Sequence, residues 1–299
     1  MPSRHILIVN ARKVTQPVFV IGAPHSGAEA VGRALKISPG FHVTMGSRTV
    51  LQAVYGFARR PSTYNARAET AVSALRDVFA RGWQLRPDSC GDCIADCRSA
   101  AGLRDGEPGP CAEQRGLSRF GDASPDLAYC VEALVSAFPD AQIVQVVRDG
   151  RDTVAAMLNN TRTMSWFQPS IANIDSEFPN PFYGIEDEGD RLAWPGFSPA
   201  AKCALRWRGA IRLAARLRMM LPMEQLKTLR YEDMIYDPRA AALALSEFTG
   251  ETIAAPVSSN HKKVRSEAGS WRAGLSLTDV GDIEKVAGEE LRRLGYGGA

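Results

Sequence analysis

A short strand that stops at a glycine and leads directly into a helix constrains this fold more than any other feature. Val18–Ile21 is β-branched or aromatic throughout, which indicates a strand buried on both faces, as in a parallel sheet. Gly22–Gly27 follows as a loop, and apolar residues then recur at helical spacing over Ala30–Leu35. Loop amides that converge at a helix N-terminus bind anions, although a short glycine loop is also typical of an ordinary strand-to-helix turn.

Strands and helices alternate along the rest of the chain. We expect further strands at Arg4–Val9, Gln142–Val147 and Leu226–Arg230. Expected helices are Ala66–Trp83, Pro125–Phe138, a helix from about Arg151, Ala200–Leu221, Pro238–Thr249 and Val280–Leu294. This alternation predicts a three-layer α/β/α fold with a central parallel sheet.

Composition fits one enzyme-sized domain over residues 1–299, with 45% hydrophobic and 23% charged residues. The net charge of +3 is too even for a nucleic-acid partner, so an anionic ligand needs a local basic site. We find no run of about 18 apolar residues and no signal peptide, which predicts a cytoplasmic protein without a membrane span. The sequence does not indicate an oligomeric state.

Two segments interrupt the pattern. Residues 88–119, rich in Gly, Pro, Cys and charge, are expected to form an insertion. Residues 165–199 are acidic and proline-rich, and we interpret them as an irregular lid or substrate loop. This segment offers six aromatic side chains as apolar substrate surface or as its own core: Trp166, Phe167, Phe178, Phe182, Tyr183 and Trp194.

Four of the six cysteines lie in the insertion. The spacing of Cys90, Cys93, Cys97 and Cys111 is compatible with a structural zinc ion, and equally with a reduced loop, so no metal site is assigned. Cys130 and Cys203 fall on expected helix faces and are interpreted as packing residues.

An arginine follows the second of the expected buried strands. Arg148 stands at the carboxyl edge of Gln142–Val147, which is where open α/β sheets place ligands. Its planar guanidinium can hold a phosphate through two hydrogen bonds. A surface ion-pair cluster with Asp149, Arg151 and Asp152 is the other interpretation.

These segments resemble those of a known family. Pro17–Gly27 (PVFVIGAPHSG) resembles the 5′-phosphosulfate loop of sulfotransferases that use 3′-phosphoadenosine 5′-phosphosulfate (PAPS), written Gly-x-Pro-Arg/Lys-Ser-Gly-Thr-Thr. Phe138–Asp152 (FPDAQIVQVVRDGRD) resembles the family's second motif. Residues 120–125 (FGDASP), 229–234 (LRYEDM) and 269–272 (GSWR) are similar to further family segments in the same order. The resemblance covers about residues 17–296.

The resemblance implies a P-loop-like phosphosulfate-binding loop, with PAPS as donor and PAP as product. Its donor-binding residues would be Gly22, Pro24, His25, Ser26, Gly27, Ala28, Glu29, Arg148, Tyr231 and Arg265. The 5′-phosphate would lie on the amides of residues 26–29. Arg148 would hold the 3′-phosphate, with Arg265 as a further ligand for it.

Four positions depart from the family pattern. His25 stands where the family has Lys or Arg, Ala28 and Glu29 replace Thr-Thr, and Ala156 replaces a Ser. Backbone amides do not depend on side-chain identity, so donor binding can survive these changes.

Transfer of a sulfuryl group needs a general base. Asp122 is the first candidate, although it can equally cap the helix after Pro125. His25 can act as base or as a cation, and His42 is a weaker third option.

The resemblance therefore implies transfer of a sulfuryl group from PAPS to a hydroxyl or amine of a small-molecule, glycan or natural-product acceptor. One alternative is a decayed relative that binds PAPS or PAP without catalysis. The other, a P-loop phosphotransferase, is disfavoured because the loop lacks the Gly-Lys-Ser/Thr ending.

Overall fold

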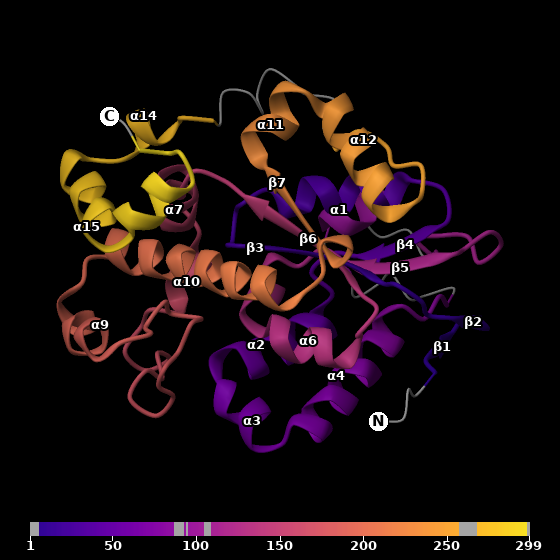
Figure 1. Cartoon of the computed structure of the whole chain (residues 1–299), viewed down its shortest axis with the longest axis horizontal. Coiled ribbons are helices and arrows are strands. Elements are labelled where there is room, and N and C mark those ends of the chain that lie inside the picture. The colour runs from indigo at the N-terminus through magenta and orange to yellow at the C-terminus, as the bar shows by residue number, and fades with distance from the viewer. Residues whose placement is uncertain (1–5, 87–92, 94, 105–108, 257–267, 298–299) are drawn as a thin grey trace.

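A five-stranded parallel sheet forms the centre of the computed structural model, which describes residues 6–86, 93, 95–104, 109–256 and 268–297 (Figure 1). All neighbouring strands of this sheet run parallel. In spatial order the strands are β4 (Phe41–Thr44), β5 (Arg119–Asp122), β3 (Val18–Gly22), β6 (Gln142–Val147) and β7 (Leu226–Arg230). The chain starts the sheet at β3, adds strands on one side and then on the other, which makes β3 the switch point where open sheets bind ligands.

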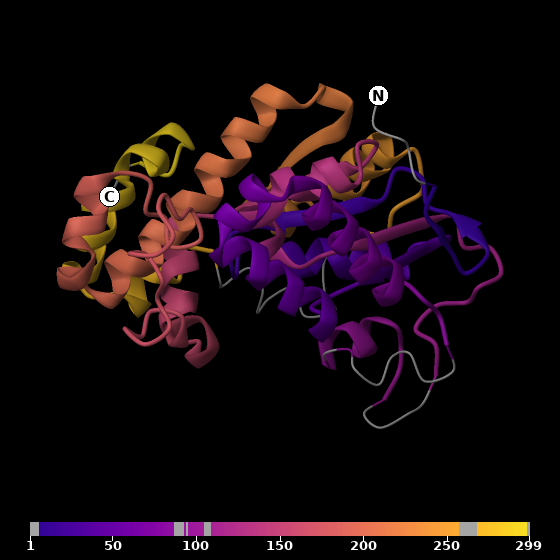
Figure 2. The ribbon, with the colours of Figure 1, turned by 90° about the horizontal axis from the view of Figure 1, so that it is seen from below.

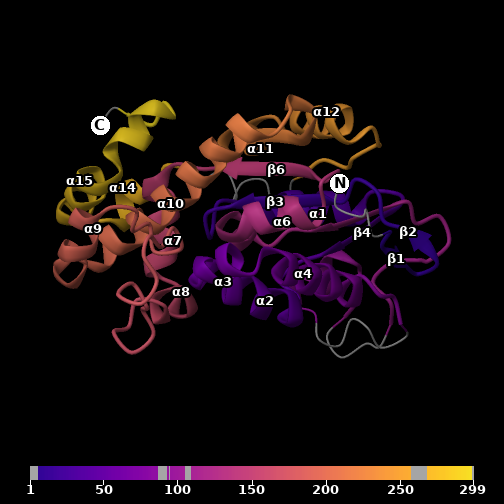
Figure 3. The same cartoon turned by 60° about the horizontal axis from the view of Figure 1, so that its bottom comes forward.

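Both faces of the sheet are covered, which confirms the three-layer prediction (Figures 1 and 3). Phe19 and Ile21 of β3 point into a core with helices α2 (Arg48–Arg59), α4 (Ala68–Gly82) and α6 (Val131–Ala137). Val18 and Val20 point into a second core, whose helices are α1 (Ala28–Ile37), α11 (Tyr231–Tyr236) and α12 (Pro238–Thr249). The alternation explains why the strand sequence is apolar at every position.

A third group of helices lies at one end of the sheet. Helices α7 (Gly150–Leu158), α10 (Pro199–Met220) and α15 (Leu277–Arg293) pack together there, with the short α14 (Trp271–Gly274) beside α7 (Figures 1 and 2). Within the described residues, no helix combines the length and the apolar character that a bilayer-crossing segment needs.

Several expected elements differ from the structure. The expected first strand is a two-residue β1 (Ile8–Val9) that pairs antiparallel with β2 (Arg12–Lys13), outside the central sheet. The helix expected after Ser124 begins as a 3₁₀ turn, η1 (Pro125–Cys130), before α6. Strand β4 and helix α2 were not expected. The remaining short elements are α3 (Pro61–Ala66), α5 (Ala95–Ala100), α8 (Thr161–Ser165), α9 (Glu188–Ala193), η2 (Trp194–Gly196) and η3 (Met223–Gln225).

The aromatic residues of the 165–199 segment mostly belong to the core. Four of the six are buried: Phe167, Phe182, Tyr183 and Trp194. Three of their ring pairs are edge-to-face and the pair Phe167–Tyr183 is tilted, so these four form core, which was the other interpretation, and do not present a substrate surface. Trp166 is half-buried and Phe178 is exposed.

Candidate functional site

The glycine loop joins β3 to α1 through two residues in the left-handed region. His25 has φ 64° and Gly27, the N-cap of α1, has φ 95°. A non-glycine residue in this conformation is uncommon and concentrates at functional sites. The Ser26 amide donates to the Ala23 carbonyl oxygen at 3.0 Å inside the loop. The loop leads directly into α1, and the first amides of a helix are available to an anion because they have no partner within the helix.

Both glycines of the loop are required by close packing. A Cβ on Gly22 would lie 2.3 Å from Ser26 Oγ and 2.7 Å from the Val146 carbonyl oxygen. A Cβ on Gly27 would lie 2.3 Å from Cδ2 of Tyr231, at the start of α11. Ser26 Oγ is buried and has no hydrogen-bond partner among the described residues. A buried hydroxyl left in this state fits an additional acceptor, such as a phosphate oxygen.

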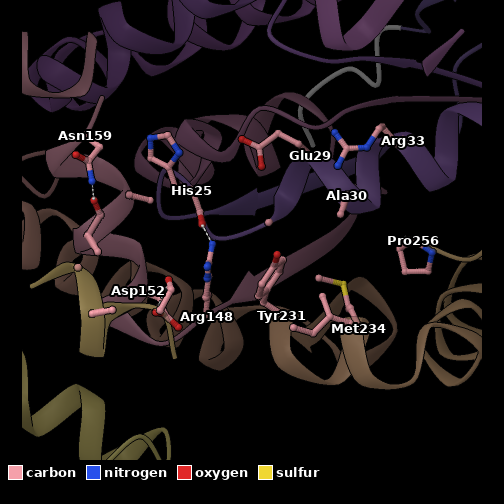
Figure 4. Close-up of a pocket in the computed structure, with 17 residues that line it drawn as sticks. His25, Glu29, Ala30, Arg33, Arg148, Asp152, Asn159, Tyr231, Met234 and Pro256 are labelled. Carbon is pink, nitrogen blue, oxygen red and sulfur yellow. Dashed lines mark hydrogen bonds between the residues drawn. The ribbon is translucent and has the colours of Figure 1, made fainter. Parts of the chain in front are cut away.

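Arg148 connects the loop to the rest of the site. It follows β6 directly and is buried, and its Nη1 donates to the His25 carbonyl oxygen at 3.2 Å (Figure 4). Its guanidinium carbon lies 4.4 Å from the centre of the Tyr231 ring. A buried guanidinium beside a loop at the carboxyl edge of a parallel sheet suits an anionic ligand.

A cavity of about 800 Å³ opens beside these residues. Its walls come from the loop, α1, α7, α11 and α14, at the carboxyl edge of β3 and β6 (Figure 4). A volume of this size is within the range of small-molecule and nucleotide sites. Among the residues predicted for donor binding, His25, Gly27, Glu29, Arg148 and Tyr231 line the cavity, and Gly22, Pro24, Ser26 and Ala28 do not. Arg265 lies outside the described residues.

The cavity also contains polar residues that the motifs do not identify. Arg33 lies one turn after Glu29 on α1 and lines the same wall (Figure 4). Asn159 lines it one turn after Ala156, where the family's Ser contact is missing. The helical spacing of Glu29 and Arg33 is visible in the sequence and could have identified Arg33.

Asp152 closes the wall on the α14 side. One carboxylate oxygen accepts from the Trp271 amide at 2.8 Å and from the Ser270 hydroxyl at 3.2 Å, and the other accepts from the Gly269 amide at 2.7 Å. Asp152 therefore ties α7 to the C-terminal segment through three hydrogen bonds.

His25 lies among charged residues that come from separate parts of the chain. The pKa of His25 is lowered from its ordinary value of 6.5, first by burial. The charge of Asp126 raises this pKa, and the charges of Arg148 and Arg206 lower it. With a lowered pKa, the imidazole is neutral at pH 7 and can accept a proton.

Asp126, Arg206 and Tyr55 form a buried network on this side of His25. Arg206 Nη2 donates to Asp126 Oδ1 at 2.8 Å, and the Tyr55 hydroxyl donates to Asp126 Oδ2 at 2.8 Å. Arg206, on α10, is 1% exposed and lies 4.0 Å from the Phe182 ring centre. No motif in the sequence identifies this network, although an arginine within an apolar stretch of an expected helix could have indicated Arg206.

Asp122 is fully buried at the end of β5. Its Oδ2 accepts from the Thr44 hydroxyl at 2.5 Å and its Oδ1 from the Ser124 amide at 2.9 Å. Burial raises the pKa of this carboxyl to about 6, against the effect of those hydrogen bonds. Asp122 is not part of the cavity wall. It fixes the turn between β5 and η1.

The suggested zinc site has no support in the structure. Within the described residues, no group of three or more His, Cys, Asp or Glu side chains is arranged to hold a metal ion. Cys90, one of the four suggested ligands, lies outside those residues.

Comparison with known proteins identifies the family. A sequence model of the sulfotransferase family matches residues 17–183. No curated protein sequence matches the chain. Among solved structures, similarity is found to the sulfotransferase domain of the olefin synthase from Synechococcus PCC 7002, with 16% identity, TM-score 0.45, and coverage of 91% of this chain and 94% of that one. A sulfotransferase from Mycobacterium avium has 15% identity and TM-score 0.44, with coverage of 94% and 77%. One from Alicyclobacillus acidocaldarius has 17% identity and TM-score 0.42, with coverage of 92% and 96%. Because the family match spans more than half of the chain and includes both the glycine loop and Arg148, the protein belongs to the sulfotransferase family.

Proposed function

We propose that the protein transfers a sulfuryl group from PAPS to a hydroxyl or amine of a small-molecule, glycan or natural-product acceptor. The observation that carries the proposal is that two anion-binding features, the glycine loop at α1 and the buried Arg148, border one cavity of about 800 Å³. PAPS carries a phosphosulfate on the 5′ carbon of its ribose and a phosphate on the 3′ carbon. Its binding therefore needs two separate anion-binding features.

In this proposal the 5′-phosphosulfate lies on the amides of residues 26–29 and accepts from Ser26 Oγ. Arg148 holds the 3′-phosphate, and its guanidinium stacks on the Tyr231 ring. Arg265 remains a proposed further ligand. Asn159 can supply a side-chain contact near the place of the missing Ser.

The chemistry requires an in-line attack on sulfur. The acceptor oxygen or nitrogen forms the new bond to sulfur, the bond from sulfur to the phosphate oxygen breaks, and PAP leaves. His25 takes the acceptor's proton, because its lowered pKa keeps it neutral at pH 7. The Asp126 carboxylate then stabilises the imidazolium that forms. Asp122 is less suited as base, since both of its oxygens accept hydrogen bonds inside the protein.

In this proposal, residues 1–299 form one catalytic domain that acts in the cytoplasm and has no nucleic-acid partner. Residues 88–119 are then an insertion, and residues 165–199 border the acceptor. The five described cysteines are free thiols, which fits a reducing compartment.

Labelled PAPS and ATP with Mg²⁺ test the proposal directly. We expect saturable PAPS binding, competition by PAP, and label transfer to at least one member of a mixed acceptor panel. Binding without transfer favours the non-catalytic relative, for which His25, Ala28, Glu29 and Ala156 are the supporting departures. Binding of ATP but not PAPS overturns the proposal in favour of a phosphotransferase.

A further inference from the structure

One side of α1 faces the donor cavity beyond the phosphate loop. The other side is fixed against the end of β5 by Gly32, where a Cβ would lie 2.4 Å from the Cβ of Ala123. With α1 held in this rotation, its residues Glu29, Ala30 and Arg33 line the cavity. Ala30 and Arg33 are one turn apart and therefore share one strip of the cavity wall.

Arg33 brings a guanidinium into this strip. Its side chain is half-buried, and among the residues that the structure describes it has no hydrogen bond, ion pair or ring contact. Figure 4 shows the guanidinium pointing back along α1 toward Glu29, which is the direction in which helix side chains lean. An arginine that only supports the fold is typically ion-paired or extends into water, whereas Arg33 forms part of a cavity wall. Its guanidinium is therefore available to a ligand.

Helix α11 supplies the facing wall. It begins at Tyr231, whose ring centre lies 4.4 Å from the Arg148 guanidinium carbon, and Met234 follows one turn later. Met234 and Ile235 are buried, and both line the cavity together with Pro256 (Figure 4). This end of the cavity is therefore apolar on the α11 side and has a planar cation on the α1 side.

The proposed positions of the two anionic groups leave this end of the cavity to the nucleobase. The 5′ group lies on the loop amides and the 3′-phosphate on Arg148, while the α7 side of the cavity presents the polar side chains of Asp152 and Asn159. A nucleobase has flat, weakly polar faces, which stack on an arginine plane and pack against a methionine sulfur. Arg33 and Met234 offer these two surfaces at the same end.

We propose that Arg33 is a specificity-determining residue of donor binding, whose guanidinium stacks on the nucleobase across the cavity from Met234. This inference rests on the proposed function, since it takes PAPS as the donor. Ala30 contributes by its small size, because a single methyl group leaves room for the base beside the guanidinium. Stacking depends on the plane of the guanidinium as well as on its charge.

A contact from Arg33 to one of the phosphates is the competing role. A phosphate contact would depend on the positive charge and would act on every ligand that carries the two phosphates. Stacking acts only on ligands that carry a base. Arg33→Lys separates the two roles, because lysine keeps the charge and can still bind a phosphate but has no plane to stack.

The test uses isothermal titration calorimetry on the whole protein with two ligands. One is PAP, and the other is 1-deoxyribose 3,5-bisphosphate, which has the same phosphates and no base. In the parent, PAP should bind about tenfold or more tightly than the base-free ligand. Arg33→Lys should weaken PAP binding about fivefold and change the Kd of the base-free ligand less than about twofold. Arg239→Lys, at an exposed position of α12, is the matched control and should change neither affinity.

Each result decides between the possibilities. Unchanged PAP affinity in Arg33→Lys, or an equal loss for both ligands, overturns the stacking role of Arg33 and leaves the proposed function intact, because the parent still binds PAP. A parent that binds both ligands equally well also overturns it. A parent that binds neither ligand overturns the proposed function together with this inference. Binding of the base-free ligand by Arg33→Lys shows at the same time that the variant is folded.

Discussion

The Gly27 backbone lies directly against the Tyr231 ring, so that a Cβ on Gly27 would be 2.3 Å from Cδ2. Gly27 also has φ 95°, where a side chain costs about 1–2 kcal/mol. We predict that Gly27→Ala displaces either the loop or the ring and weakens PAPS binding at least tenfold, measured by isothermal titration calorimetry. Gly281→Ala, in the exposed part of α15 where a Cβ meets nothing within 4 Å, is the control and should bind PAPS normally. Equal affinity of the two variants contradicts this role of Gly27.

Arg148 is predicted to recognise the 3′-phosphate through its planar fork. Arg148→Lys keeps the charge but loses the two parallel hydrogen bonds, so PAPS affinity should fall tenfold to a hundredfold, equivalent to about 1.4–2.8 kcal/mol. The discriminating ligand is adenosine 5′-phosphosulfate, which lacks the 3′-phosphate and should lose much less affinity. Arg239→Lys, at an exposed position of α12, controls for the substitution itself. An equal loss for both nucleotides would show that Arg148 acts elsewhere.

The elements with strong local patterns were predictable. Helix α4 lies within one or two residues of its expected bounds, and β6, β7 and α12 match theirs. In these segments the apolar spacing and the flanking Pro or Gly agree with the tertiary packing. Strand β4 (FHVT) was missed because it is four residues long and has a histidine in a fully buried position.

The site residues that directly follow a strand could be predicted from the sequence. Those brought together by the packing of helices far apart in the sequence could not. The loop after β3 and Arg148 after β6 meet because parallel strands end at the same edge. The approach of Tyr55, Asp126 and Arg206 depends on how α2, η1 and α10 pack, which no local pattern encodes. Asp122 and Asp126 illustrate the limit: Asp122 ends β5 and Asp126 lies four residues later in η1, but Asp126 is the one whose charge acts on His25.

We predict that His25 contributes more to the rate of sulfuryl transfer than to the affinity for PAPS. His25→Ala should reduce kcat by about a hundredfold to ten-thousandfold while changing the Kd for PAPS less than threefold. Single-turnover kinetics and equilibrium binding measure the two effects separately. Equal losses in both, or full activity, contradict the role of His25 as base.

The pH dependence of transfer should follow the lowered pKa of His25. A general base works in its neutral form, so kcat should fall as pH decreases through a pKa below 6.5 and stay level just above it. The Asp126 carboxylate raises that pKa, and Asp126→Asn should therefore move the acid limb to still lower pH. Urea unfolding of Asp126→Asn must accompany the profile, because the change leaves Arg206 without its ion-pair partner. A folded Asp126→Asn with an unmoved limb contradicts the coupling.

Asp122 should make the protein's stability depend on pH in a defined direction. Its pKa is about 6 in the folded protein, above the ordinary value of 3.8, so the folded state binds the proton more tightly than the unfolded state. The resulting stabilisation is fully present below pH 3.8 and is lost as pH rises through 6. Its full size is about 3 kcal/mol, of which about 2 kcal/mol is lost between pH 4 and pH 7.5.

Asp122→Asn mimics the protonated form: its amide oxygen can accept from the Ser124 amide, and its NH₂ group can donate to the Thr44 hydroxyl. The free energy of unfolding of Asp122→Asn, measured with urea, should therefore rise relative to the parent by that amount over the same pH interval. A difference that stays constant from pH 4 to pH 7.5 would mean that Asp122 titrates alike in the folded and unfolded chain.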